Sequence, residues 1–168
     1  MYRSLGGISP ATAGYGVVTI APQVSQTEGP SGVNTTITTI RGVVKSNWKR
    51  HADVGNTSSG GANGGAAASP RTVFELHVQV PVGSRARITI PLLHASPTTA
   101  TVTEVRDDVI VWSGSGSRQH NSDNLKEEKE HPEWLWKSAY LDAPDNEPSN
   151  SAIQLETTAG VFHFKVSA

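Results

Sequence analysis

The sequence predicts an all-β protein, an antiparallel two-sheet β-sandwich of about eight strands. Its composition favours strands and turns, because Gly, Thr, Ser and Val outweigh Leu, Glu and Lys. Short segments in which apolar and polar residues alternate recur along the chain, and no convincing amphipathic helix separates them. The length of 168 residues is compatible with one compact domain.

The N-terminal residues, by contrast, have helical spacing. Tyr2, Leu5 and Ile8 recur every three residues, the pair Gly6-Gly7 suits a helix end, and Pro10 prevents continuation. A helix this short is not stable alone. We therefore expect a short helical remnant and a connector over residues 1–13, followed by a strand.

The clearest strands lie in the second half of the chain. Residues 74–81 and 86–91 alternate between apolar and polar side chains, and the turn residues 82–84 between them indicate a hairpin. Residues 161–166 alternate in the same way and form the closing strand. The remaining candidate strands are 17–20, 34–40, 43–48, 100–105, 109–112 and 151–156. Two sheets packed face to face bury the apolar side of each, and Trp48 and Trp112 are expected in this core.

Several motifs, taken in order, resemble a known protein family. They are Tyr2-Arg3, Gly6-Gly7-Ile8, Pro10, Gly14-Tyr15, Val18-Thr19-Ile20-Ala21-Pro22-Gln23, Gly32-Val33-Asn34-Thr35-Thr36, Thr39-Ile40-Arg41-Gly42-Val43-Val44, Trp48-Lys49-Arg50, Phe74 to Pro81, Ala86 to Pro91, and Ala159 to Val166. This order resembles the C-terminal β-domain of bacterial-type α-L-rhamnosidases, beginning where the last helix of the catalytic barrel enters it. The chain departs from the family at Ala13, where proline is usual, and in apparent insertions at 51–70 and 117–150.

The resemblance implies a noncatalytic accessory domain. Residues 1–13 would be the remnant of the last barrel helix and 14–168 the β-sandwich, which packs on and stabilises the catalytic barrel of an enzyme that removes terminal rhamnose from glycosides. The residues expected at the domain interface are Tyr2, Leu5, Ile8 and Tyr15. The catalytic carboxylates of the family lie in the barrel, so the resemblance places no catalytic residue in this chain.

The two apparent insertions differ in character. Residues 51–70 are rich in Gly, Ala, Ser and Asn, and we expect a flexible hairpin tip there. Residues 117–150 contain a charged run followed by aromatic residues, and we expect one long loop. A helix over 124–137 is a weak alternative, since Pro132 interrupts it.

The aromatic residues of the second insertion are the best candidates for ligand binding. Trp134, Trp136 and Tyr140 on an exposed loop would suit the CH-rich face of a sugar, so a free-standing carbohydrate-binding module is the competing interpretation. The alternative for these residues is that the loop folds back and they cover an open edge or mouth of the sandwich, because exposed Trp side chains favour aggregation.

Other kinds of chemistry receive little support from the sequence. Glu127, Glu128, Glu130 and Glu133 could supply paired carboxylates, but a solvated face explains them better, so an independent hydrolase is a third and weaker interpretation. The six histidines lack metal-ligand spacing, although His77 and His163 could face each other across a sheet. We therefore expect no metal site and no cofactor.

Composition also limits the partners. A net charge of -1 without a basic face argues against nucleic acid, and no segment suggests a membrane span. The absence of cysteine excludes disulfides. The expected partners are the catalytic barrel and a rhamnosylated carbohydrate, while the cellular location and the status of Met1 as the native start stay open.

Overall fold

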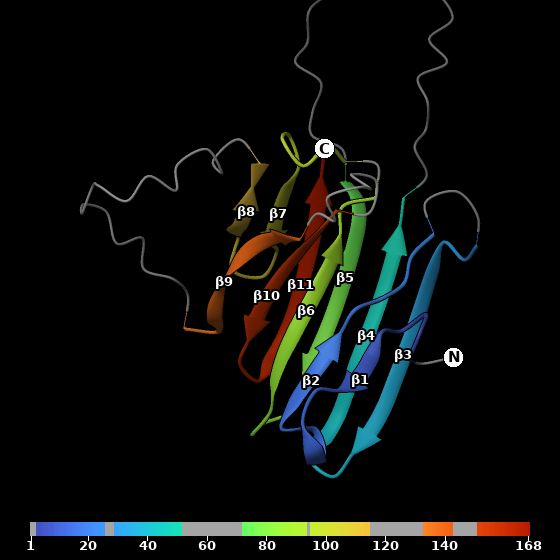
Figure 1. The fold of residues 1–168 in the computed structure, drawn as a ribbon, viewed down its shortest axis with the longest axis vertical. Helices are drawn as coiled ribbons and strands as arrows, with labels where there is room; N and C mark the ends of the chain where they lie inside the picture. Colours follow the sequence, from blue (N-terminus) through green and yellow to red (C-terminus); the bar gives the residue numbers. More distant parts are fainter. Residues whose placement is uncertain (1–2, 26–28, 52–71, 94, 115–132, 143–150) are drawn as a thin grey trace, which may run out of the picture.

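The protein is a sandwich of two β-sheets that lie one in front of the other (Figure 1). The computed structural model describes residues 3–25, 29–51, 72–93, 95–114, 133–142 and 151–168. The strands are β1 (Ile8–Pro10), β2 (Val17–Ile20), β3 (Gly32–Thr39), β4 (Gly42–Arg50), β5 (Thr72–Val80), β6 (Arg85–Pro91), β7 (Thr101–Glu104), β8 (Val109–Ser113), β9 (Leu135–Asp142), β10 (Ala152–Thr157) and β11 (Gly160–Ser167). Among these described residues, no helix has the length and apolarity that crossing a bilayer requires.

The first sheet has five strands in the order β1-β2-β6-β10-β9. All of its neighbouring strands are antiparallel except β2 and β6, which run parallel with Ile20 opposite Ile88. The parallel pair brings the N-terminal strands to β6, far along the chain. The hairpin predicted for residues 74–81 and 86–91 is wrong, because β5 belongs to the other sheet and the turn between β5 and β6 crosses from one sheet to the other. The sheet is therefore mixed, whereas the sequence pattern predicted only antiparallel pairing.

The second sheet has six strands in the order β3-β4-β5-β11-β7-β8, and all of its pairs are antiparallel. Its centre is formed by β5 and β11, where Leu76 lies opposite Phe164 and His77 opposite His163. The last strand of the chain thus lies between strands that precede it by many residues, so long-range pairing holds this sheet together.

The core lies between the two sheets and follows the alternation seen in the sequence. Fully buried side chains include Leu76 on β5, Ile88 on β6 and Phe164 on β11. Trp48 and Trp112 are also buried, as predicted. Their alternate neighbours along the strands, such as His77, Arg87 and Lys165, lie on the outer faces and are mostly polar. The predicted all-β sandwich is confirmed, with eleven strands in the described residues.

The N-terminal segment forms a strand rather than the expected helix. Ile8 pairs with Ile20 of β2, and its side chain is fully buried in the core. Gly7 has a φ of +68°, which turns the chain just before β1. In residues 3–25, the helical residues are those of the 3-10 turn η1 (Ala13–Tyr15). The predicted helical remnant is therefore wrong, because pairing with β2 sets the backbone here. The division of the chain at residue 13 stays a prediction.

The predicted loop over residues 117–150 contains strand β9. This strand forms the edge of the five-stranded sheet and pairs with β10, with Tyr140 opposite Gln154. The expectation of one continuous loop is therefore wrong in the described part, residues 133–142. The weak alternative of a helix reaching Lys137 is also wrong at its end, since Leu135 to Lys137 belong to β9. The flexible tip predicted for 51–70 lies almost wholly outside the described residues.

Candidate functional site

The residues predicted at a domain interface have different environments. Ile8 is fully buried inside the sandwich, so its side chain is not available to a neighbouring domain. Leu5 is half-buried, and its carbonyl oxygen accepts a hydrogen bond of 2.6 Å from Nε1 of Trp48. Tyr15 is half-buried against the core. Tyr2 lies outside the described residues.

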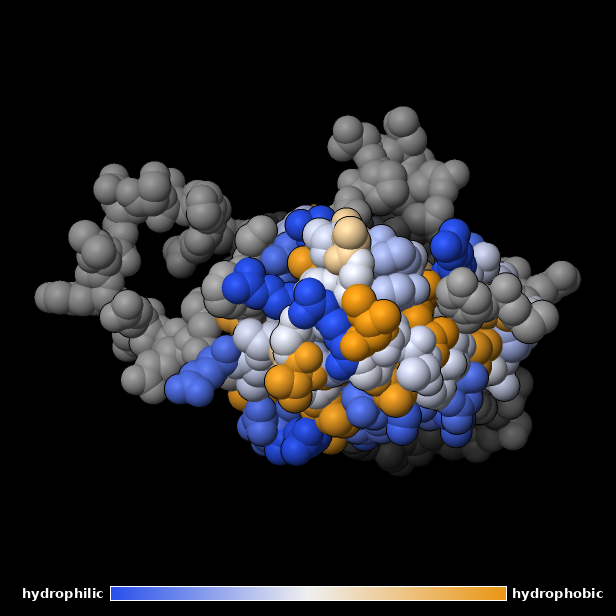
Figure 2. Space-filling model, turned by 90° about the horizontal axis from the view of Figure 1, so that it is seen from below, coloured by the Kyte–Doolittle hydropathy of each residue, from blue (hydrophilic) through white to orange (hydrophobic). Residues whose placement is uncertain are grey.

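An apolar end of the sandwich lies next to Tyr15. It consists of the β3–β4 and β5–β6 turns, in which Ile40 and Val82 are each 88% exposed. Figure 2 views the molecule from this end and shows hydrophobic side chains among hydrophilic ones. Together with Tyr15, these two exposed aliphatic side chains form a candidate contact surface at one end of the sandwich. We call the surface formed by Tyr15, Ile40 and Val82 the apolar end.

Arg41 joins the turns of the apolar end to each other. Its Nε donates to the carbonyl oxygen of Gly14 at 2.8 Å, and its Nη1 donates to that of Gly83 at 2.9 Å. The hydroxyl of Ser84 also donates to the carbonyl oxygen of Tyr15 at 2.8 Å. These hydrogen bonds link the 3-10 turn η1 to the β3–β4 and β5–β6 turns, so the surface that carries Ile40 and Val82 is braced rather than formed by independent loops.

Trp134 packs into the sandwich. Its ring lies 5.2 Å from that of Phe162 and 6.3 Å from that of Phe164, measured between centroids. Its indole Nε1 donates to Oδ2 of Asp107 at 2.8 Å. This arrangement agrees with the interpretation in which the segment folds back and covers the sandwich. Much of the Trp134 ring is therefore not accessible to a sugar.

Tyr140 is placed differently and is 55% exposed on the outer face of the five-stranded sheet. Its hydroxyl donates to Oε1 of Gln154 at 2.8 Å. The same two residues line a pocket of about 260 Å³ together with Leu155 and the ion pair of Arg87 and Glu156, whose atoms lie 3.0 Å apart. An exposed aromatic ring beside polar side chains is suited to a sugar. The side chain of Trp136 lies outside the described part of the structure.

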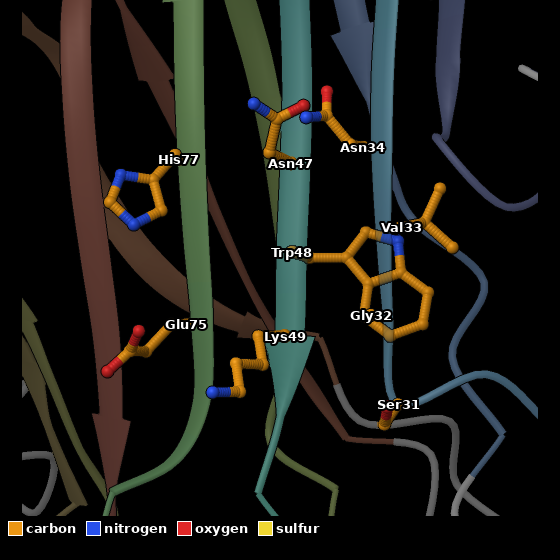
Figure 3. A pocket seen from close by; sticks show the side chains of 9 residues that line it. All are labelled: Ser31, Gly32, Val33, Asn34, Asn47, Trp48, Lys49, Glu75 and His77. Carbon is orange, nitrogen blue, oxygen red and sulfur yellow. The ribbon is translucent and has the colours of Figure 1, made fainter.

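A larger pocket of about 470 Å³ lies on the six-stranded sheet (Figure 3). The strand register places Asn34, Asn47, His77 and His163 in one row across β3, β4, β5 and β11. The first three of these residues line the pocket, along with Lys49 and Glu75. The sequence predicted that His77 and His163 face each other, and their rings do stack with centroids 3.7 Å apart.

Glu75 is the centre of a cluster on this face. Its Oε1 lies 3.6 Å from Nε2 of His51 and 3.7 Å from Nζ of Lys165, and its Oε2 lies 3.9 Å from Nε2 of His163. Burial, and after it the proximity of His77, lowers the pKa of His163, while Glu75 acts in the opposite direction. Lowering the pKa favours the neutral imidazole at His163. Strand periodicity predicted the two histidines but not this cluster, which depends on the register of β4, β5 and β11.

The two pockets contain few groups for acid-base catalysis. Among the described lining residues, each pocket has one carboxylate, Glu75 in the larger and Glu156 in the smaller, whereas glycoside hydrolysis needs two. Of the acidic run named above, Glu133 is exposed, and Glu127, Glu128 and Glu130 lie outside the described residues. The buried carboxylate of Glu104 accepts hydrogen bonds from the backbone N–H groups of Asp107 and His163, at 2.8 and 3.0 Å, and serves the fold.

The fold and these surfaces define the chain as a β-sandwich domain. In a comparison with known protein families, residues 7–57 match the bacterial α-L-rhamnosidase C-terminal domain family. This finding confirms the resemblance seen in the ordered motifs of the sequence. No curated protein sequence matches the chain.

Solved structures show the same fold. The α-L-rhamnosidase from Dictyoglumus thermophilum is similar over 99% of this chain, with a TM-score of 0.60 and 17% identity. The Streptomyces avermitilis α-L-rhamnosidase complexed with L-rhamnose is also similar over 99% of the chain, with a TM-score of 0.50 and 17% identity. The chain spans only 13% and 10% of the length of these two proteins, respectively.

Proposed function

We propose that this chain is a noncatalytic C-terminal accessory domain of an α-L-rhamnosidase-like glycoside hydrolase, in which it packs on the catalytic barrel and stabilises it. The observation that carries the proposal is the match of residues 7–57 to the C-terminal domain family. Two α-L-rhamnosidases that share the fold over nearly the whole chain support it, since the chain corresponds to a small part of each.

The apolar end is the surface through which we propose the barrel is contacted. Contacts between domains of one protein typically bury about 600 to 1,500 Å², and aliphatic side chains near the centre of such a contact contribute most when water is excluded from them. Ile40 and Val82 are available for this role because they are almost fully exposed. Ile8 is not, because the sandwich itself buries it.

The braced turns suit a mechanical role. Arg41 holds the η1 turn and the β5–β6 turn in place through the carbonyl oxygens of Gly14 and Gly83. Contact with such a surface would restrict the motion of the barrel wall. The domain would not take part in the chemical reaction. Tyr15, which packs against the core from this end, stays among the proposed interface residues.

Charged residues at the apolar end should prevent this contact. Ile40→Asp and Val82→Asp are each expected to weaken binding to an α-L-rhamnosidase catalytic barrel about tenfold or more, because burying such a side chain contributes about 1.5 to 3 kcal/mol. Titration calorimetry measures the affinity of the chain for an isolated catalytic barrel that lacks its own C-terminal domain. The preferred barrel is one encoded in frame immediately upstream of Met1.

Ile110→Asp is the matched control. Ile110 is 63% exposed but lies on β8, at the opposite edge of the six-stranded sheet from β3. All three substitutions are at exposed positions, so their melting temperatures should stay near that of the unaltered protein. Failure of the unaltered chain to bind the barrel would contradict the proposed function, and equal effects of all three substitutions would contradict the proposed surface.

Carbohydrate binding is the second candidate function, and the exposed ring of Tyr140 in its polar pocket favours it. A sugar could stack on this ring, and the hydroxyl groups of the sugar could bind Gln154 and the ion pair of Arg87 and Glu156. Because Trp134 is packed against Phe162, the proposed site is centred on Tyr140 rather than on three aromatic residues together.

Removing the Tyr140 ring tests this site. Tyr140→Ala should abolish any binding of rhamnosides at millimolar concentration, since stacking supplies much of the contact. Tyr140→Phe is the matched control, because it retains the ring and loses only the hydrogen bond to Gln154, and it should retain most of the affinity. Calorimetry with methyl rhamnoside gives the measurement, and binding that survives Tyr140→Ala would exclude this pocket.

A further inference from the structure

Two buried histidine nitrogens beside Glu75 have no hydrogen-bond partner among the residues that the structure describes. They are Nε2 of His51 and Nε2 of His163, and the nearest carboxylate oxygens lie 3.6 and 3.9 Å away, beyond hydrogen-bond distance. A buried polar atom without a partner costs free energy. The cluster therefore contains lone pairs or N–H groups that a bound species could satisfy.

The donor atoms of three residues also converge. One atom each from Glu75, His77 and His163 lies within 4.8 Å of the other two. These residues come from the two adjacent central strands, with His77 directly opposite His163. Their backbone positions are thus held by the sheet, and only side-chain rotation is needed to bring the donors closer.

We propose that Glu75, His77 and His163 form a binding site for a divalent transition-metal ion, with Zn²⁺ as the ion of best fit. Imidazole nitrogen and carboxylate oxygen are zinc ligands, whereas calcium and magnesium prefer oxygen alone. Three protein ligands of this kind leave the fourth position of a tetrahedral ion to water. The site is separate from the apolar end and does not depend on the proposed function.

Binding requires a modest rearrangement. Zinc–nitrogen bonds of about 2.0 to 2.1 Å place tetrahedral ligand atoms about 3.3 Å apart, so the donors must close from their separations of up to 4.8 Å. The stacked rings, at present inclined by only 21°, must tilt so that both lone pairs point at the ion. His77 is the exposed member of the pair, so its ring is the one that we expect to rotate.

Lys165 opposes the ion. Its ammonium group lies 3.7 Å from Oε1 of Glu75 and both competes for the carboxylate and repels a cation. His51 lies near the same oxygen, so the side of Glu75 that faces His163 is the better side for metal. Removal of the Lys165 charge should consequently strengthen binding, an effect that a purely structural role of the cluster does not produce.

The experiment is a titration of the metal-free chain with Zn²⁺ alone. Calorimetry measures the affinity and the number of ions bound, and thermal denaturation measures the melting temperature at each zinc concentration. We expect one ion per chain and a melting temperature that rises with zinc, because the ion links β5 to β11. His77→Gln should reduce the affinity at least tenfold. Lys165→Gln should increase it severalfold. Cobalt(II) in place of zinc should give the intense visible absorption of a four-coordinate site.

Two controls accompany these variants, one for the charge change at Lys165 and one for the folding of His77→Gln. Lys49→Gln removes a charge from the neighbouring strand, where Lys49 lies opposite Glu75, and serves as the comparison for Lys165→Gln. Because His77 is exposed, His77→Gln should fold normally, and circular dichroism checks this. Absence of zinc binding at millimolar concentration, or unchanged affinity in the variant with both His77→Gln and His163→Gln, would overturn the proposal.

Discussion

Phe164→Ala is expected to lower the free energy of unfolding by about 3 to 5 kcal/mol, the range for removing a buried phenylalanine ring. Phe164 is fully buried at the centre of the six-stranded sheet. Its ring contacts those of Phe162 and Trp134, with centroids 6.1 and 6.3 Å away. The cavity would lie where β11 faces the other sheet. The surrounding strands cannot move inward to fill it without losing hydrogen bonds to their neighbours.

For a protein of this length the same change corresponds to a fall in melting temperature of about 6 to 20 °C. Urea unfolding followed by tryptophan fluorescence measures the free energy, since Trp134 reports directly on the altered site. Val161→Ala is the matched control on the same strand, because Val161 is 49% exposed. A loss for Phe164→Ala no greater than that for Val161→Ala would show that the sandwich core does not include β11 as described.

Gly7→Ala is expected to destabilise the protein by about 3 kcal/mol or more, through two independent costs. The residue has a φ of +68°, which a side chain tolerates at a cost of about 1 to 2 kcal/mol. In addition, an added Cβ would lie 2.2 Å from the carbonyl carbon of Ala21. That neighbour is backbone, and the adjacent N–H of Ala21 is already hydrogen-bonded to the carbonyl oxygen of Gly7 at 3.0 Å, so β1 must shift away from β2.

Gly14→Ala separates the two costs. Gly14 has nearly the same φ, +65°, but an added Cβ there would meet only the flexible end of Ile40, at 3.3 Å. Thermal denaturation of both variants should therefore show a small loss for Gly14→Ala and a much larger one for Gly7→Ala. Equal losses would mean that strain alone acts and that the close approach of Gly7 to Ala21 is not important.

The sequence predicted the parts of the fold that depend on local periodicity. Strands β5, β6 and β11 follow from side chains that alternate over seven or more residues. Their partners do not, because the hairpin predicted for β5 and β6 is wrong and these two strands lie in different sheets. Strand β1 has three residues, too few for any alternation, and its spacing also suits a helix. The parallel pairing of β2 with β6 leaves no local signal, because it depends on which distant strand completes the sheet.

The candidate sites were predictable only in part for the same reason. Alternation placed His77 and His163 on the outer face, but the approach of His51 and Lys165 to Glu75 depends on the register of three strands. The sequence pattern predicts a strand that ends at Ile40, whereas this residue lies in the turn that forms the apolar end. The charged run before residue 135 predicts a loop, and the edge strand β9 that follows it has no clear local signal in the sequence.

The position of β11 has a consequence for how the molecule acquires its structure. Residues 160–167 come last in the described order of strands, yet they lie between β5 and β7 in the middle of a sheet. Strands β5 and β7 pair with β11 and not with each other, so the sheet is incomplete without its last strand. The folding barrier therefore includes the entropy cost of bringing distant parts of the chain together. During synthesis on the ribosome, the sandwich is therefore expected to assemble only after its final strand has emerged.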